Sequence, residues 1–477
     1  MYIDLIIILA FFVLTMGLGF YFKNHSTSNN DYFLGGRSIP WWVLSLSLVA
    51  TETSTLTFLG IPALSYVGDY SFLSLAIGMI IGRIISAIYI LPKYISKEYT
   101  SIYEWIGDVF GKNSQKSLSA LFSLIRILAD GVRLYAASLP LSFLLFQFFP
   151  EEYSFDQISI ISLIIISLST IFYSAYGGFK AVVWNDFIQF FIYLAGGIIC
   201  IVLLYMDYGN IEINWNIFHS TMRKDDGNWD PYFFLFSIPG GILLSLGSHG
   251  TDQMIVQRLL ACRSLAESRI ALISSGFIVF VQFVLFLLIG SYLIHALPNS
   301  SMPNRVFSEY IVNSVPSPFR GLILAGVFAS AMSTLSSTLN SLALTTKIDL
   351  NFSWLKKIST IALTGFWGCI LLSSSLLPFF LDEKTKSSIV ELGLTFSSYV
   401  FGPMVALFFL EILNIPKPDL KLKNFFPVVL FLSIALLFLI TYRFQAPFTW
   451  MVGLGILAFN FIYGLGFGFI KIRTKRL

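Results

Sequence analysis

Runs of about 20 apolar residues recur from one end of the chain to the other, separated by short polar segments. An α-helix of that length crosses the hydrocarbon core of a bilayer, which is roughly 30 Å thick. The pattern therefore predicts thirteen membrane-spanning helices. They lie near residues 2–22, 41–65, 70–95, 117–148, 156–176, 180–206, 232–258, 268–296, 319–347, 356–380, 386–412, 424–442 and 447–470.

The composition supports a membrane protein built of helices. Of the 477 residues, 56% are hydrophobic and 12% are charged, whereas a soluble domain has about 25% charged residues. The first segment lacks a basic start and a small-residue cleavage site, so we expect a retained span and not a signal peptide. No nucleotide-binding motif occurs, and we expect neither ATP nor a nucleic acid as a partner.

The distribution of basic residues predicts the orientation of the chain. With the N-terminus outside and the C-terminus in the cytoplasm, most of the 30 Lys and Arg residues fall on the cytoplasmic side. This is the asymmetry that the positive-inside rule demands. The Pro-rich outer segment 297–318 is predicted to hold a short helix lying on the membrane surface.

Two of the predicted spans are interrupted midway by Gly, Pro, Ser and Thr. They are 41–65 and 232–258, and each opens a block of five spans, 41–206 or 232–411. Irregular backbone at membrane depth occurs only where it lines a cavity or is buried in protein. The pairing predicts a transporter made of two inverted repeats, with residues 1–30 and 424–470 as peripheral additions.

A cluster of hydroxyl side chains marks the ninth span. In FASAMSTLSSTLNS (328–341), about half of the residues are Ser, Thr or Asn, and Ser333, Thr334, Ser336 and Ser337 fall within about one helical turn. Hydroxyl oxygens are hard, neutral ligands for a small cation. The alternative is that these side chains bond to the preceding turn, or allow two helices to pack closely.

Four segments resemble motifs of the sodium/solute symporter family, in the same order and spacing. They are DYFLGGRSIPWWVLSLSLVATETSTLTFLGIP (31–62), YGGFKAVVWNDFIQ (176–189), GTDQMIVQRLL (250–260) and GLILAGVFASAMSTLSSTLNS (321–341). The resemblance covers about residues 31–412. It implies an all-α membrane protein with a LeuT-type core of five plus five helices, carrying sodium and a small solute by alternating access.

The resemblance also implies where sodium binds. A first sodium site would use the carbonyls of Ala50, Thr53 and Ser330 with the hydroxyls of Ser333 and Thr334. Five neutral oxygens suit a monovalent ion. A second site, present in some members such as the sialic acid symporter, would use Asp186, Ser336 and Ser337. The alternative for Asp186 is that it caps a helix or pairs with a cation of the chain.

The solute is expected between the two broken helices and the fourth span. The candidate contacts are Glu52, Ser54, Thr57, Arg133, Ser245, Ser248 and His249. Either Arg133 or Arg126, which share one helix face with Asp130, would hold a substrate carboxylate. The alternatives are that Glu52 pairs permanently with Arg133, Arg126 or Arg83, and that His249 is a packing residue.

These expectations predict a symporter that imports an amino acid, an organic acid or a sugar acid, working as a monomer in a bacterial inner membrane. The side chains that bind hexose in sugar-transporting members are absent. Two alternatives stay open: a proton-coupled carrier that uses Glu52, and a sodium/sugar symporter with an atypical site. A channel, a sensor or a membrane enzyme fits less well, because charged pore rings, a signalling domain and a metal-spaced cluster are missing.

Overall fold

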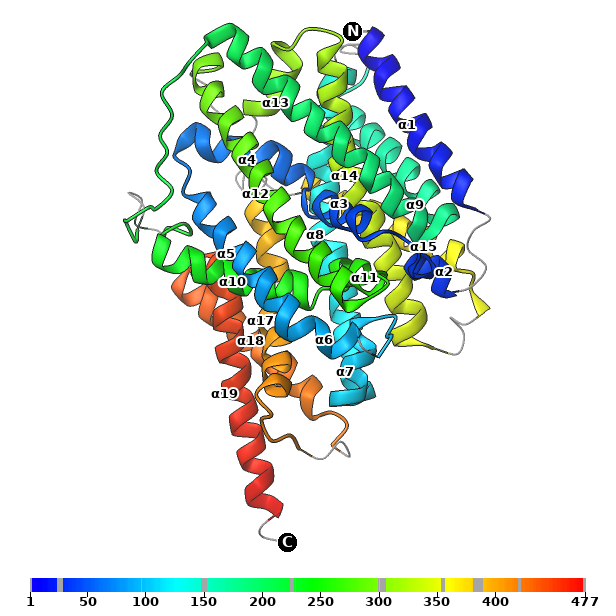
Figure 1. Cartoon of the computed structure of the whole chain (residues 1–477), viewed down its shortest axis with the longest axis vertical. Coiled ribbons are helices and arrows are strands. Elements are labelled where there is room, and N and C mark those ends of the chain that lie inside the picture. The colour runs from blue at the N-terminus through cyan, green and yellow to red at the C-terminus, as the bar shows by residue number, and fades with distance from the viewer. Residues whose placement is uncertain are drawn as a thin grey trace.

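The chain forms a bundle of helices with its N-terminus at one end and its C-terminus at the other (Figure 1). The computed structural model describes residues 2–23, 29–95, 97–146, 152–223, 227, 229–298, 300, 306–352, 357–380, 389–418 and 422–474. Within these residues the regular elements are helical, apart from two isolated β-bridges in the segment 219–233. The expected all-α class is confirmed.

The main helices follow the predicted spans within a few residues. They are α1 (Tyr2–Phe22), α3 (Trp41–Glu52), α4 (Thr55–Val67), α5 (Phe72–Ile85), α6 (Leu91–Ile95), α7 (Ile102–Phe110), α8 (Lys112–Phe146), α9 (Phe155–Tyr208), α10 (Phe234–Gly250), α11 (Gln253–Leu260), α12 (Leu265–Ala296), α13 (Val306–Asn313), α14 (Phe319–Leu344), α15 (Thr360–Ser374), α17 (Ile389–Ile412), α18 (Phe425–Phe444) and α19 (Phe448–Thr474).

The helix positions agree with the sequence, but they do not establish the number of membrane crossings. In the described part of the chain, eight helices are long and apolar enough to cross a bilayer, and the bent pair α3 and α4 would make a ninth. The shorter apolar helix α10 and the apolar stretch Ser397–Ile412 of α17 fall below that length. The figure of thirteen crossings stays a prediction. The short helix expected in segment 297–318 is confirmed as α13.

Helix α9 joins two of the predicted spans, 156–176 and 180–206, through a kink at Gly178. This glycine has φ 58° and ψ −158°. This conformation is strongly unfavourable for a residue that has a Cβ atom, whereas glycine adopts it readily. The YGGFK sequence therefore interrupts the helix at this kink, and α9 consists of two helical segments, one on each side of Gly178.

Both predicted helix breaks are present, but the second lies later than expected. Thr53 and Ser54 separate α3 from α4, with a bend of 60°. In the second pair, Pro239 lies inside α10, and the helix ends only at Gly250. The chain breaks there because Asp252 caps the next helix, its side chain accepting a hydrogen bond from the backbone nitrogen of Met254 at 3.0 Å.

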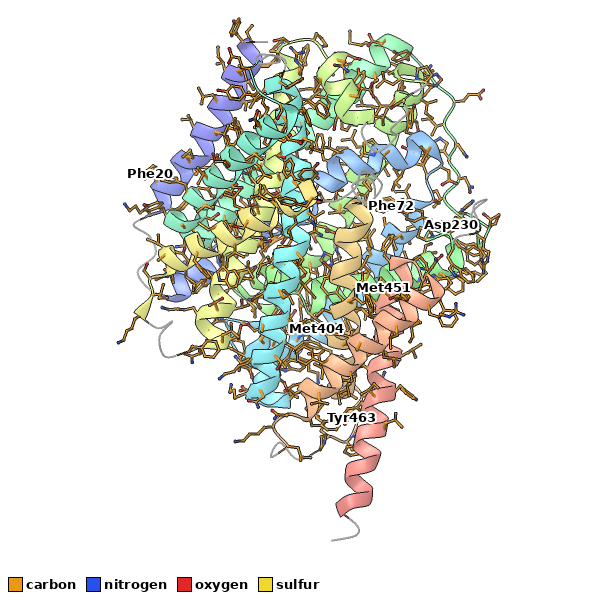
Figure 2. All side chains as sticks on the ribbon, turned by 180° about the vertical axis from the view of Figure 1, so that it is seen from behind. Phe20, Phe72, Asp230, Met404, Met451 and Tyr463 are labelled. Atoms are coloured by element: carbon orange, nitrogen blue, oxygen red, sulfur yellow. The ribbon has the colours of Figure 1, made fainter. Side chains whose placement is uncertain are left out.

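Helix α14 lies at the centre of the molecule and is almost entirely buried. It packs against α9, α1, α8 and α3. At its first turn, the carboxylate of Asp4 on α1 accepts hydrogen bonds from Arg320 at 2.9 Å and from the backbone nitrogen of Gly321 at 3.0 Å. The apolar side chains that project from the bundle, such as Phe20 on α1, suit contact with lipid (Figure 2).

Helices α5 and α10 cross at very short range. A Cβ atom added to Gly78 would lie 2.2 Å from the carbonyl oxygen of Ile238, and one added to Gly241 would lie 2.2 Å from that of Leu75. Small residues of this kind let helix backbones approach closely in membranes. The crossing brings Arg83 on α5 and His249 on α10 to within 2.9 Å of each other.

Candidate functional site

The break between α3 and α4 exposes backbone oxygens inside the protein. Thr53 has φ −77° and ψ 83°, and Ser54 is extended, so neither continues the helix. The last carbonyls of α3 consequently lack the helical partners that they would otherwise have. Ala50 and Thr53 are both fully buried, so other groups of the protein, or a bound ion, must satisfy these oxygens.

The hydroxyl cluster of α14 faces this break. The hydroxyl of Ser333 donates to the carbonyl of Ala50 at 2.8 Å, and that of Thr334 donates to the carbonyl of Thr51 at 3.1 Å. Both hydroxyls also lie within 3.3 Å of the carbonyl of Ser330. Four of the five residues expected at the first sodium site therefore contact one another. Their oxygens are neutral and hard, which suits sodium.

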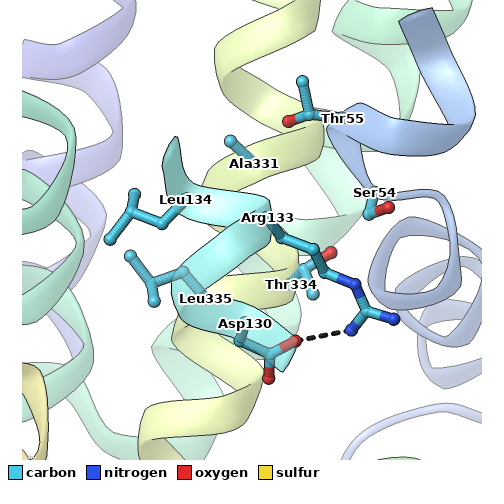
Figure 3. A pocket seen from close by; sticks show the side chains of 8 residues that line it. All are labelled: Ser54, Thr55, Asp130, Arg133, Leu134, Ala331, Thr334 and Leu335. Atoms are coloured by element: carbon cyan, nitrogen blue, oxygen red, sulfur yellow. Dashed lines mark hydrogen bonds and ion pairs between the residues drawn. The ribbon is translucent and has the colours of Figure 1, made fainter. Parts of the chain in front are cut away.

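A small cavity lies beside this cluster, between α4, α8 and α14 (Figure 3). In this structure it has room for about one water molecule. Its lining combines one ion pair with hydroxyl and aliphatic groups. The lining residues are Ser54, Thr55, Asp130, Arg133, Leu134, Ala331, Thr334 and Leu335. Two candidate solute contacts, Ser54 and Arg133, are thus placed in one cavity.

Arg133 is held in the cavity by a single ion pair. Its Nη1 donates to Oδ1 of Asp130 at 2.5 Å (Figure 3). Its Nε is buried and has no hydrogen-bond partner among the described residues. Asp130 is shared, because its other oxygen accepts a hydrogen bond from Thr338 at 2.5 Å and lies 3.8 Å from Arg126. Asp130 thus lies within ion-pair distance of both arginines of this helix face.

The remaining candidates form a second polar cluster around Arg83. The guanidinium of Arg83 pairs with Glu52 and lies 2.9 Å from the ring of His249. The same ring lies 3.4 Å from Glu52 and 2.8 Å from the hydroxyl of Ser248, and 3.5 Å from that of Ser245. Glu52 therefore has the partner that one of the alternatives foresaw. Neither this cluster nor Thr57 lines the cavity described above.

Two of the three residues expected at the second sodium site, Asp186 and Ser337, form a third cluster with Arg258, whereas the hydroxyl of Ser336 donates to the carbonyl of Ser333 at 3.1 Å. Asp186 and Arg258 are both buried, and Oδ2 of the carboxylate lies 2.7 Å from Nη2 of the guanidinium. The same Nη2 donates to the hydroxyl of Ser337 at 2.5 Å. In this structure Asp186 therefore pairs with a cation of the chain, Arg258, as one of the alternatives stated.

Three important residues escaped the sequence analysis of the site. Thr55 lines the cavity, and Ser47 donates to Asp186 at 2.6 Å. Arg258 lies in the GTDQMIVQRLL motif, at the end of the predicted span 232–258. Its position in a short helix, eight residues past Gly250, carries no signal that the side chain turns inward.

Comparison with known proteins identifies the family of the chain. A model of the sodium:solute symporter family matches residues 32–414. A sodium/sialic acid symporter of Proteus mirabilis is 27% identical over 362 residues, which cover 72% of this chain and 70% of that protein. A sodium/glucose cotransporter of Vibrio parahaemolyticus is 26% identical over 391 residues, covering 73% of this chain and 68% of that protein.

The solved structures show the same fold. A sodium-coupled sialic acid symporter in a substrate-bound outward-open state superposes with a TM-score of 0.81 at 21% identity, covering 97% of both chains. The transporter Mhp1, in a closed conformation, gives a TM-score of 0.59 at 14% identity, covering 94% of this chain and 95% of its own. The chain therefore belongs to the sodium:solute symporter family, and the predicted sodium-coupled symport of a small solute is confirmed at that level.

Proposed function

We propose that the chain imports a solute that carries a carboxylate, and that Arg133 binds this carboxylate. The observation that carries the proposal is the buried, unpartnered Nε of Arg133 beside the cavity. An arginine grips a carboxylate best through two parallel N–H bonds from one edge of the guanidinium. The pair with Asp130 uses Nη1, which leaves the edge formed by Nε and Nη2 for the solute.

The first sodium site lies next to this position. Thr334 contributes both to the cavity lining and to the oxygens that face the break in α3 and α4. A sodium ion held by Ala50, Thr53, Ser330, Ser333 and Thr334 would join α14 to the broken helix and shape one wall of the solute cavity. That shared wall supplies a physical reason why the binding of sodium and solute would be coupled.

Within carboxylates, we infer that a sugar acid of the sialic acid class is the first solute to test. Two of the curated relatives are sodium/sialic acid symporters, and the superposed structure is another. The cavity presents the hydroxyl groups of Ser54 and Thr55 beside the arginine, which suits a polyhydroxylated acid. Other relatives transport monocarboxylates, so small organic acids belong in the same test.

We infer that Glu52 supports the fold and does not carry a proton through the cycle. Its carboxylate is paired with the buried Arg83 and also faces His249. If Glu52 became protonated, the guanidinium of Arg83 would stay buried without a counter-charge, which costs free energy. This geometry supports sodium coupling over the proton-coupled alternative.

The arrangement of the two ends of the bundle supports a proposal for the orientation of the chain. Helix α13 and the N-terminus lie at one end of the bundle, and α7 with the C-terminus lie at the other (Figure 1). The second end carries most of the loop lysines and arginines, such as Lys97 and Lys112. We propose that it faces the cytoplasm of a bacterial inner membrane. We further propose that one copy of the chain is sufficient for transport.

Uptake into proteoliposomes tests the proposed solute. We expect sodium-dependent uptake of N-acetylneuraminic acid, pyruvate or proline, and none of galactose. Arg133→Gln should lower uptake of the carboxylate at least about tenfold, since a charge-assisted bidentate contact contributes roughly 1.5–3 kcal/mol. Arg223→Gln, which changes an exposed loop arginine stacked on Trp229, is the matched control. Uptake of galactose that is unchanged in the Arg133→Gln variant would overturn the assignment of a carboxylate solute.

A further inference from the structure

The guanidinium of Arg258 lies where a second sodium ion would bind. This second-site cluster consists of Asp186 on α9, Ser336 and Ser337 on α14, and Arg258 on α11. A cation at that place requires the carboxylate and the two hydroxyls together. Arg258 Nη2 already contacts two of these three groups, Oδ2 of Asp186 at 2.7 Å and the hydroxyl of Ser337 at 2.5 Å.

The arginine is fixed by all three of its nitrogens. Its Nε donates to the hydroxyl of Ser47 at 2.7 Å, and its Nη1 donates to the carbonyl of Met254, one turn back on its own helix, at 2.8 Å. Arg258 is 1% exposed. A side chain held by this many bonds in a buried position has no water nearby to replace them, so displacing it would leave several polar groups unpaired.

The hydroxyl of Ser337 is already engaged by its neighbours. It accepts a hydrogen bond from Nη2 of Arg258 at 2.5 Å and donates to the carbonyl of Ser333 at 2.6 Å. The hydroxyl of Thr51 lies 3.1 Å away, and either of these two hydroxyls can be the donor. Because a hydroxyl has one hydrogen and two lone pairs, these three contacts leave little capacity for a cation.

The charges in this cluster sum to zero without sodium. Asp186 is the carboxylate and Arg258 is the cation, and both are buried. A sodium ion added beside them would be an uncompensated positive charge inside the membrane part of the protein, which is costly. Oδ1 of Asp186 has no hydrogen-bond partner among the described side chains, but a single oxygen is far fewer than a sodium ion needs.

We propose that Arg258 replaces a second sodium ion, so that this symporter carries one sodium per solute. The proposal rests on the proposed first sodium site and concerns a different group of residues. It deepens the function by assigning the number of ions. Arg258 then links α11 to α3, α9 and α14 whether or not sodium is present, and only the first sodium site responds to the ion gradient.

Direct binding of radioactive sodium (²²Na⁺) to the purified protein tests the proposal without knowledge of the solute. We expect about one ion per chain and a Hill coefficient of about 1. Two ions per chain in the wild-type protein would overturn the proposal while leaving sodium coupling intact. No saturable binding at all would overturn the first sodium site as well, so the two failures are distinguishable.

Variants of Arg258 give a second, independent measurement. Arg258→Met empties the position of the guanidinium and frees Asp186 and Ser337, so we expect binding to rise from one ion toward two. Arg258→Lys keeps a cation there and should stay at one ion. Adding Asp186→Asn to Arg258→Met should return the count to one. If the Arg258→Met protein folds and still binds a single ion, the arginine does not stand in for sodium.

Discussion

At the scale of single residues, two types of polar group are used differently in this protein. Neutral oxygens, such as those of Ala50, Ser330 and Ser333, gather at the break in α3 and α4 and belong to no ion pair. Two carboxylates of the neighbouring clusters, in contrast, are each compensated by a buried guanidinium: Asp186 by Arg258, and Glu52 by Arg83. A neutral oxygen cage can accept an added cation, whereas a closed ion pair cannot accept one without leaving a net charge buried.

This difference predicts the effect of removing the two hydroxyls of the first sodium site. Ser333→Ala with Thr334→Ala deletes two oxygens from the set of five, so we expect the sodium concentration for half-maximal uptake to rise at least about tenfold. The control is Ser341→Ala, a buried hydroxyl of the same helix that bonds only to its own turn at 3.0 Å. Unchanged sodium dependence of uptake in the double variant would show that the site is misplaced.

At the scale of elements, the position of the clusters depends on how closely helices approach. Gly276 on α12 is one example, because a Cβ atom there would lie 2.9 Å from Nη1 of Arg83. The crossing of α5 and α10 at Gly78 and Gly241 is another. A Cβ atom added to either glycine would lie 2.2 Å from a backbone carbonyl oxygen of the other helix. These glycines determine whether Arg83 can reach Glu52, although none of them touches the solute cavity.

The crossing of α5 and α10 makes a stability prediction. Gly78→Leu would force the two helices apart, and overpacking of this kind typically costs 1–3 kcal/mol. We expect a lower melting temperature for the purified protein and reduced uptake. Gly464→Leu on α19 is the matched control, because no atom lies within 4 Å of the added Cβ. Equal melting temperatures for the two variants would contradict the packing argument.

At the scale of the whole molecule, sodium should act as a stabilising ligand that joins helices from both proposed repeats. The proposed first sodium site brings together α3, from the block 41–206, and α14, from the block 232–411, which already share a hydrogen bond from Ser333 to Ala50. An ion bound there resists separation of the two blocks. An ion that binds only the folded state raises the free energy of unfolding. The increase is about 2.7 kcal/mol when the ion concentration is one hundred times its dissociation constant.

A thermal measurement checks this expectation. The melting temperature of the purified protein should be higher in sodium than in potassium at fixed ionic strength, and N-acetylneuraminic acid should raise it further only when sodium is present. The Ser333→Ala, Thr334→Ala protein should lose the sodium effect, so that its melting temperature is the same in both salts. That temperature should be lower than that of the wild-type protein in potassium, because the carbonyls of Ala50 and Thr51 lose their hydrogen bonds. A sodium effect that survives in this variant would place the responsible ion elsewhere.

The sequence alone determined the class of the molecule and the place of its helices. Long apolar runs leave a chain in a bilayer few options besides helices, because every backbone group must be satisfied internally. The bounds of α1, Tyr2–Phe22, agree with the predicted span for this reason. The hydroxyl pattern of α14 and the polar break at Thr53 and Ser54 were equally readable, since both place polar groups where lipid excludes them.

Only the tertiary structure decided which charges meet. Glu52 had three arginines as candidate partners, and the close crossing of α5 and α10 put Arg83 within reach. Arg258 looked like a loop cation, yet α11 turns it inward to Asp186, 72 positions away along the chain. Such pairs depend on the approach and rotation of helices far apart in sequence. A pattern along the chain records which face of a helix is polar, but not which distant side chain will face it.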